Sequence, residues 1–360
     1  MEKIGANVLS DCSFIRSIIL SDGLTEIGGG AFCHCENLES VVIPESVTKI
    51  APYAFARSDL KTIILPDGLT EIEERIFYDC ENLESVIIPE TVTKIGPFAF
   101  SCSGLKSITL PGGRLTEIGE GALSSCRNLE TVVIPDSVTK IAPRTFAHSG
   151  LKSIILPHGL TEIGNLAFEE CRNLETVVIP NSVTKIGRYA FWNSGLKSIT
   201  LLDGRLTEIG ECAFRDCDDL ETVVIPNSVT KIGPWVFTES GLKSIILPNG
   251  LTEIGEGLFY NCYNLETVII PETVTKIGPD AFAESELKSI ALPHGLTEIG
   301  KEAFCNCDYL ETIVIPETVT KIGPGAFAES GLKSIILPNG IEIGEDAFRD
   351  CHNLVIHPMQ

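Results

Sequence analysis

Apolar side chains recur along the whole chain at a spacing of 22 or 23 residues, and each recurrence has the same internal pattern. In the segment 48–69, Leu60, Ile63 and Leu65 follow the order Leu-x-x-Ile-x-Leu, so the last two residues share one face of an extended chain. Pro66 follows, and we expect the strand to end there because proline cannot donate to a sheet ladder. The pattern predicts one short strand per repeat, which we call the LxxVxI strand.

A second apolar set lies in the other half of each repeat. A turn from Val47 to Ile50 leads to Ala54 and Phe55, which we expect in a single helical or 3₁₀ turn on the opposite wall. Of the 16 Phe residues, 14 occupy this one position, from Phe32 to Phe348, and we call them the Phe column. One repeat cannot bury these side chains alone. The fixed period therefore predicts a solenoid whose coils stack about 4.8 Å apart and form a parallel sheet along one side.

The repeat resembles the BspA-like, or Treponema pallidum-type, leucine-rich repeat over essentially the whole chain. The matching positions are Leu38, Val41, Ile43, Pro44, Val47, Ile50, Ala54, Phe55 and Cys80. We therefore expect a single leucine-rich-repeat domain over residues 1–360, a curved right-handed stack of about sixteen coils of 22–24 residues. Its parallel sheet is expected on the concave face and its short helical or 3₁₀ turns on the convex face. The first coil is expected to be incomplete and the last degenerate, at 341–360.

The resemblance also implies a function. Members of this family are bacterial or protist surface proteins that bind host proteins or other cells, and the family supplies no catalytic residue. The implied partner is a protein of the host matrix or of another cell surface. The implied location is the cell surface or the secreted fraction. We expect a monomer without a cofactor.

The charge of the chain excludes some partners. Lys and Arg number 27 against 49 for Asp and Glu, a formal charge of -22, which repels nucleic-acid backbones and anionic lipid. Two columns of alternating charge run along the stack: Glu39, Lys61 and Glu84 continue one of them. We interpret these columns as register control, since stacking sets each charge beside opposite charges on both sides. The excess acid lies outside them, mostly on turns.

No stretch approaches 18 uninterrupted apolar residues, so we expect no membrane insertion. The first residues show no basic segment followed by an apolar one, and so no secretory signal. Together with cysteines that look reduced, this leaves an alternative open, a cytoplasmic repeat scaffold for protein–protein interaction.

Cysteine and histidine offer little chemistry. A column of cysteines recurs in every second coil, at Cys35, Cys80, Cys126, Cys171, Cys217, Cys262, Cys307 and Cys351. Successive members should lie about 10 Å apart, too far for disulfides, so we interpret them as buried free thiols that fill space. Cys102 lies between two members and is the best disulfide candidate. No CxxC or CxxH spacing and no nucleophile–base set occurs, so we expect no metal, no cofactor and no catalytic residue.

The LxxVxI strands also present a candidate binding surface. The residue that follows the second core position is almost always Val or Ile, and we call this set the β-branched column. Its candidate partner-binding members are Ile64, Ile87, Val133, Ile155, Val178, Val224, Ile246 and Ile269, and its departures are Thr109, Thr200 and Ala291. An exposed apolar surface of this extent commonly marks an interaction site, and we expect a partner to dock there on the concave face. The alternative is that Val and Ile serve β-propensity alone.

Aromatic residues interrupt the uniformity of the repeats. Tyr53, Phe98, Tyr189 and Trp235 occupy the same turn position in alternate coils. They are candidate hot spots because aromatic residues are enriched at interface centres. Packing over the turns explains them equally well.

Overall fold

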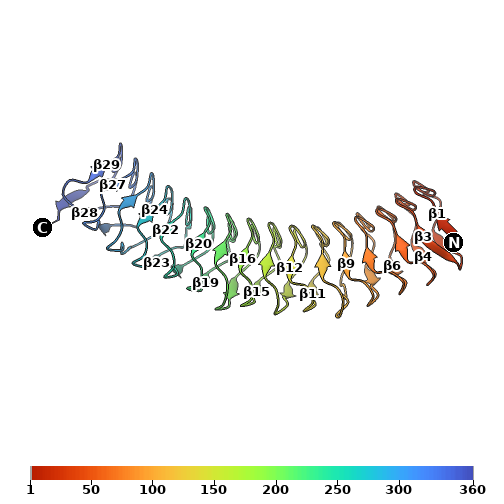
Figure 1. Ribbon diagram of the computed structural model, residues 1–360. Coiled ribbons are helices and arrows are strands. Elements are labelled where there is room, and N and C mark those ends of the chain that lie inside the picture. Colours follow the sequence, from red (N-terminus) through yellow and green to blue (C-terminus); the bar gives the residue numbers. More distant parts are fainter. Residues whose placement is uncertain (1, 360) are drawn as a thin grey trace. The chain divides into compact units, whose positions relative to one another are not determined.

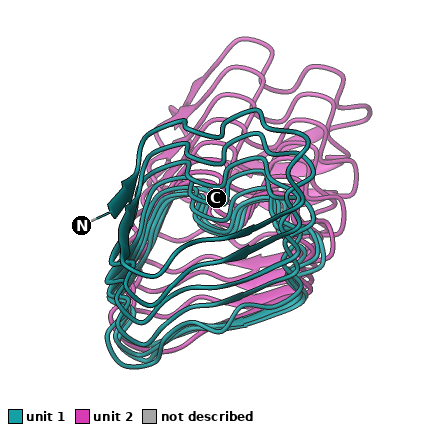
Figure 2. Ribbon diagram, turned by 90° about the vertical axis from the view of Figure 1, so that its right-hand side faces the viewer, with its two compact units in different colours: residues 1–182 teal, residues 183–360 magenta. Residues whose placement is uncertain are grey.

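The computed structural model describes residues 2–359, which form thirty short strands and no helix. The chain divides into two compact units, residues 1–182 and 183–360. In each unit successive coils follow one another in chain order (Figure 1) and enclose a common interior (Figure 2). The solenoid prediction is confirmed. The single domain over 1–360 and the curvature of its sheet stay predictions.

The predicted LxxVxI strands are present in both units. In unit 1 they are β2 (Ser17–Ile19), β4 (Ser40–Val42), β6 (Thr62–Ile64), β8 (Ser85–Ile87), β11 (Thr131–Val133), β13 (Ser153–Ile155) and β15 (Thr176–Ile179). In unit 2 they are β17 (Ser198–Leu201), β19 (Thr222–Val224), β21 (Ser244–Ile246), β23 (Thr267–Ile269), β26 (Thr312–Val314), β28 (Ser334–Leu337) and β30 (Val355–Pro358). They pair in parallel and in register, for example Ile63 with Val86 and Ile64 with Ile87.

A second series of parallel strands lies where the sequence predicted only a turn. These strands contain the charged residue and Ile of each Thr-x-Ile motif, and we call them the TxI strands. In unit 1 they are β1 (Glu2–Ile4), β3 (Leu24–Ile27), β5 (Lys49–Ile50), β7 (Glu71–Ile72), β9 (Lys94–Ile95), β10 (Glu117–Ile118), β12 (Lys140–Ile141) and β14 (Glu162–Ile163). In unit 2 they are β16 (Lys185–Ile186), β18 (Glu208–Ile209), β20 (Lys231–Ile232), β22 (Glu253–Ile254), β24 (Lys276–Ile277), β25 (Glu298–Ile299), β27 (Lys321–Ile322) and β29 (Glu342–Ile343).

The Phe column forms the centre of each unit's core. In unit 1 the ring centroids of Phe32 and Phe55 lie 5.3 Å apart, and those of Phe55 and Phe77 lie 5.7 Å apart. The planes of these rings are within 10° and 8° of parallel. All three side chains are fully buried, and each burial is worth about 1.5–3 kcal/mol. Because the Phe55 ring is covered on its two sides by the rings of the neighbouring coils, the core forms only between coils.

No residue from 2 to 359 in the wall that carries the Phe column is assigned to a helix, so the expected helical or 3₁₀ turn is not confirmed. Tyr53 and Arg57 have φ of 61° and 57°, a left-handed conformation that ends any right-handed turn. The backbone N–H groups of Phe55 and Arg57 donate to the carbonyls of Ile76 and Tyr78 in the next coil, instead of to residues four positions earlier. The turns therefore form a third ladder of hydrogen bonds between coils.

This geometry accounts for a regularity in the sequence. The residues two positions before and two positions after each Phe of the column have positive φ in coil after coil, for example Arg144 at 55° and His148 at 57°. Neither position ever carries Val, Ile or Thr. A β-branched side chain is a genuine outlier at positive φ, whereas residues without a branch at Cβ adopt it at these two positions throughout both units.

We predict that Arg144→Val destabilises the fold and that Arg144→Asn does not. The Arg144 side chain is half exposed, so its replacement removes little packing. Val at positive φ should lower the free energy of unfolding by about 1–2 kcal/mol, while Asn adopts this conformation readily. Urea unfolding of both variants checks this. Equal stability of the two variants would contradict the assigned backbone conformation.

Candidate functional site

The β-branched column points to solvent in both units. Along each LxxVxI strand the middle residue is buried and its two neighbours are exposed, as for Thr62, Ile63 and Ile64 in β6. In unit 1, 63% of Ile64, 62% of Ile155 and 53% of Val178 are exposed. In unit 2, Val224 reaches 79%. All eight candidates are exposed, namely Ile64, Ile87, Val133, Ile155, Val178, Val224, Ile246 and Ile269. Their role in binding stays a prediction.

Ion pairs border this column. Lys61 Nζ lies 2.6 Å from Glu39, Lys106 lies 2.8 Å from Glu84, and Lys152 lies 2.7 Å from Glu130. The hydrogen bond between Lys61 and Glu39 lowers the pKa of the carboxyl and raises the pKa of the amine. Each lysine pairs with the glutamate of the preceding coil. This column therefore consists of separate close pairs, in which each of these lysines contacts a glutamate on one side only, and it is not the continuous ladder that the sequence predicted.

The TxI strands show the continuous arrangement instead. In unit 1, Glu26 contacts both Lys3 and Lys49. In unit 2, Glu208 lies 3.5 Å from Lys185 and 3.1 Å from Lys231. All of these groups are solvated, so each pair adds little stability. Because both strand surfaces carry lysine and glutamate in pairs, the charges that border the β-branched column are of both signs.

The β-branched column is broken at three positions, and these breaks differ in structure. Thr200 lies inside β17, whereas residues 105–110 around Thr109 and residues 287–292 around Ala291 form no strand. Ile108 and Leu110 nevertheless stay buried, at 7% exposure each. At Ala291 the surface is hollowed instead, to a volume of about 760 Å³. Sequence reasoning missed this pocket, although Ala291 itself was the signal.

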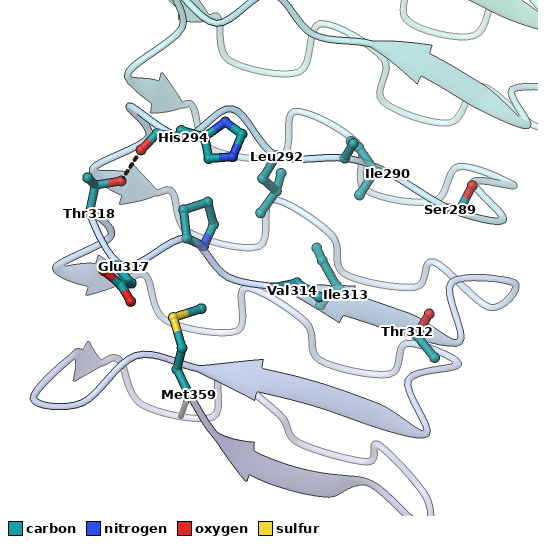
Figure 3. Close-up of a pocket in the computed structure, with 12 residues that line it drawn as sticks. Ser289, Ile290, Leu292, His294, Thr312, Ile313, Val314, Glu317, Thr318 and Met359 are labelled. Atoms are coloured by element: carbon teal, nitrogen blue, oxygen red, sulfur yellow. Dashed lines mark hydrogen bonds between the residues drawn. The ribbon is translucent and has the colours of Figure 1, made fainter.

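The pocket has an apolar middle and two polar ends (Figure 3). Ile290, Leu292, Ile313 and Val314 lie along its middle, between the coil of residues 289–294 and the coil of residues 312–318. His294, Glu317 and Thr318 lie at one end together with the apolar side chain of Met359, and Ser289 and Thr312 lie at the other end. Thr318 Oγ1 donates to the His294 carbonyl at 2.6 Å, which ties the two coils together at that end.

The candidate aromatic residues lie in the turns and pack on neighbouring coils. In unit 1 the Arg75 guanidinium lies 5.6 Å from the Tyr53 ring centroid and 4.8 Å from that of Phe98. Arg75 Nη1 also donates to the Tyr53 hydroxyl at 2.6 Å. The Phe98 ring covers Gly121, where a Cβ atom would collide with it.

Unit 2 repeats this arrangement with other residues. Tyr189 meets Trp192 edge to face at 6.0 Å, and Trp235 meets Tyr260 at 5.7 Å. The Trp235 ring covers Gly257 as Phe98 covers Gly121. All four candidate aromatics are already engaged in packing contacts, which favours the packing interpretation. Their role as hot spots stays a prediction.

The cysteine column is free, as predicted, and its members are buried except for the partly buried Cys351; the column also forms hydrogen bonds. The Cys80 thiol donates to the Phe55 carbonyl at 3.1 Å and lies 3.5 Å from the Ser58 hydroxyl. Cys126 makes the equivalent contacts with Phe100 and Ser103. These thiols therefore satisfy a carbonyl at the centre of the core as well as filling space. Cys102, the disulfide candidate, is free and half buried.

Burial determines the reactivity of these thiols. It raises the pKa of Cys80 to about 11 and the pKa of Cys171 to about 12. Within residues 2–359, no group of three or more His, Cys, Asp or Glu side chains is placed to hold a metal ion. In the same residues no helix has the length and apolar character to cross a membrane.

Comparison with known proteins identifies relatives of this architecture. The family profile of the BspA type leucine rich repeat region matches residues 25–150, 139–250 and 230–355. A leucine-rich repeat protein from Bacteroides ovatus has 32% sequence identity and a TM-score of 0.83, over 99% of this chain and 87% of that one. No curated protein matches the chain.

Two further solved structures are similar to the chain with lower sequence identity and a lower TM-score. A leucine-rich repeat protein from Eubacterium ventriosum is 27% identical with a TM-score of 0.55, over 76% of this chain and 83% of that one. A leucine rich cell surface protein from Faecalibacterium prausnitzii is 25% identical with a TM-score of 0.51, over 96% of this chain and 88% of that one.

We predict that iodoacetamide separates the thiols of the folded chain into two classes. At pH 8 a thiol with a pKa of about 11 is ionised in only about one molecule in a thousand, and the thiolate is the nucleophile. The half-buried Cys33, Cys102 and Cys305 should react first, and Cys80 and the other buried members of its column only after unfolding. Mass spectrometry of the labelled peptides checks this. Equal labelling of Cys80 and Cys102 in the folded chain would contradict it.

Proposed function

Because the chain belongs to the BspA-type leucine-rich-repeat family, we propose that it is a non-catalytic module that binds a protein partner through the β-branched column. The observation that carries this proposal is the exposure of Val or Ile at the same strand position in coil after coil. Each unit presents its own stretch of this surface. The proposal concerns the exposed face of the LxxVxI strands in either unit.

Physical reasoning favours binding over β-propensity as the role of this column. If β-propensity alone were needed at a solvent-facing strand position, Thr would serve as well as Val or Ile, because its β-propensity is comparable and its hydroxyl group is readily hydrated. Thr109 and Thr200 show that this fold accepts Thr there. Other members nevertheless keep exposed apolar side chains: Val178 in β15 is 53% exposed and Val224 in β19 is 79% exposed. An apolar surface bordered by neutralised charges loses little on dehydration when a partner covers it.

The charge of the chain makes two other classes of partner unfavourable. The formal charge of -22 disfavours nucleic acid and anionic membrane surfaces. The LxxVxI strands themselves carry paired charges, so a partner need not be basic to contact the β-branched column. We propose a protein of the host matrix or of another cell surface, bound by a monomer.

The cell surface or the secreted fraction is the proposed location. The Faecalibacterium prausnitzii relative is described as a cell surface protein, and this supports the same location for the present chain. Antibody labelling of intact cells that express the full-length protein, compared with lysed cells, tests it. Labelling only after lysis would place the protein inside the cell.

A cytoplasmic scaffold is the second candidate function, and the thiols favour it. All thirteen cysteines of the chain are free, as is usual in a reducing compartment. Burial and raised pKa values would also protect most of them from oxidation outside the cell. Protein binding by the β-branched column is common to both functions, so location alone separates them.

We predict that the triple variant Val133→Thr, Ile155→Thr, Val178→Thr loses binding while remaining folded. The three residues lie in β11, β13 and β15 of unit 1, and removal of their methyl groups should weaken binding about tenfold or more. The measurement is saturable binding of the full chain to an immobilised, solubilised extracellular-matrix extract. Thermal unfolding of both proteins verifies the fold.

Thr109→Val is the matched control, because it extends the apolar column in the same unit. It should bind at least as tightly as the original chain. Unchanged binding of the folded triple variant, or no saturable binding of the original chain to the matrix extract, would contradict the proposed function.

A further inference from the structure

The pocket at Ala291 differs from every neighbouring part of the β-branched column in unit 2. Ile246, Ile269 and Val314 cover the surface before and after it, while Ala291 has a single methyl group. The resulting hollow of about 760 Å³ is within the range of ligand pockets, about 300–1,000 Å³. It is therefore large enough for a bulky side chain with its neighbour.

Core side chains are accessible in this pocket. Ile199 and Leu201 are 5% and 6% exposed, and they occupy the same repeat positions as Ile290 and Leu292. Ile290 and Leu292 are instead only partly buried. Residues 289–292 also form no backbone hydrogen bond with another described residue. Residues 289–292 thus offer a ligand in the pocket both apolar surface and backbone groups for hydrogen bonding.

The polar end of the pocket carries one exposed carboxylate, that of Glu317. In some other coils the residue after the strand-ending proline bonds to the backbone of the next coil: Glu272 accepts from the His294 N–H at 2.9 Å, and Asn227 accepts from the Asn249 N–H at 3.0 Å. Glu317 occupies this position in its own coil. Within residues 2–359, no hydrogen bond or ion pair engages its carboxylate.

The remaining ionisable group at this end is already paired. The His294 ring Nδ1 lies 3.2 Å from Glu272, and the backbone and ring of His294 lower the pKa of that carboxyl. No lysine or arginine lines the pocket. A complementary occupant therefore combines an apolar body with a positive charge near Glu317.

We propose that the pocket receives a bulky apolar side chain of the protein partner, with the basic side chain that follows it paired to Glu317. This inference rests on the proposed function, because it places an anchor within the same strand face. Aromatic anchors in desolvated pockets carry much of the affinity of protein interfaces. The uniform Val and Ile positions supply contact area, and the pocket at Ala291 supplies selectivity for one sequence.

Blocked dipeptides provide the probes. Binding of N-acetyl-Trp-Arg-amide to the full chain is followed by the methyl NMR signals of Ile290, Leu292 and Ile313. These signals should shift and saturate. N-acetyl-Trp-Glu-amide should bind about fivefold more weakly because its charge is repelled, and N-acetyl-Ala-Arg-amide about tenfold or more weakly because it lacks the ring.

Two variants and one control assign the binding to this pocket. Ala291→Ile restores the side chain found at Ile246 and Ile269, so it should preserve the fold, fill the hollow and abolish dipeptide binding. Glu317→Gln should keep the preference for Trp and remove the preference for Arg over Glu. Thr200→Ile makes a comparable change in the same unit away from the pocket and should change nothing. Thermal unfolding confirms that each variant is folded.

The outcomes separate this inference from the proposed function. Absence of shifts at Ile290 and Leu292, undiminished binding by Ala291→Ile, or equal affinity for the Arg and Glu dipeptides would each overturn the pocket assignment. If any of these occurs while the triple Thr variant still loses matrix binding, the docking face stands and the anchor pocket falls. If the dipeptide binds as expected while the triple variant keeps matrix binding, the docking face falls.

Discussion

No coil of this chain can bury its own apolar residues, and the rest of the structure depends on that constraint. Phe55 is fully buried because Phe32 and Phe77 lie against its two faces. Three ladders hold neighbouring coils at the spacing that this packing requires: the LxxVxI strands, the TxI strands and the turns with their left-handed residues. Side chains that point inward or along the stack are thereby committed to the fold, and those on the exposed strand face remain free.

The walls of the solenoid differ in how far their surface side chains contact other parts of the chain. In the turns, Tyr53, Arg75 and Phe98 stack on one another across three coils, so their aromatic surface is largely used within the chain. On the LxxVxI strands, the lysine and glutamate side chains pair with each other. Within residues 2–359 the exposed side chains of the β-branched column have no such pairing. The fold gives no reason for these exposed side chains to be apolar.

Much of the fold follows from the sequence because the repeat fixes register. The alternation in β6 predicts a buried Ile63 and an exposed Ile64, and both are observed. The left-handed turns could not be predicted, since Tyr53, Arg75 and Gly121 at this position share no chemistry and only the absence of β-branched residues marks it. The TxI strands were missed because two-residue strands lack a readable alternation.

The pocket was equally hidden, because Thr109, Thr200 and Ala291 look alike as departures from one column. Only the structure shows that Thr200 stays within a strand while Ala291 opens the surface. The consequence of a small residue depends on how its neighbours relax, and the sequence does not encode that locally. The exposed column and the charge pairs beside it were predicted in outline, whereas the pocket between its members was not.

The central claim is that a protein partner covers the exposed face of the LxxVxI strands. Hydrogen–deuterium exchange of the full chain, with and without saturating matrix extract, tests it most directly. We predict that bound partner slows exchange in LxxVxI segments such as 60–66 and 151–157 and leaves the turns around Tyr53 and Trp235 unchanged. Protection confined to those turns, or to the TxI strands, would contradict the account.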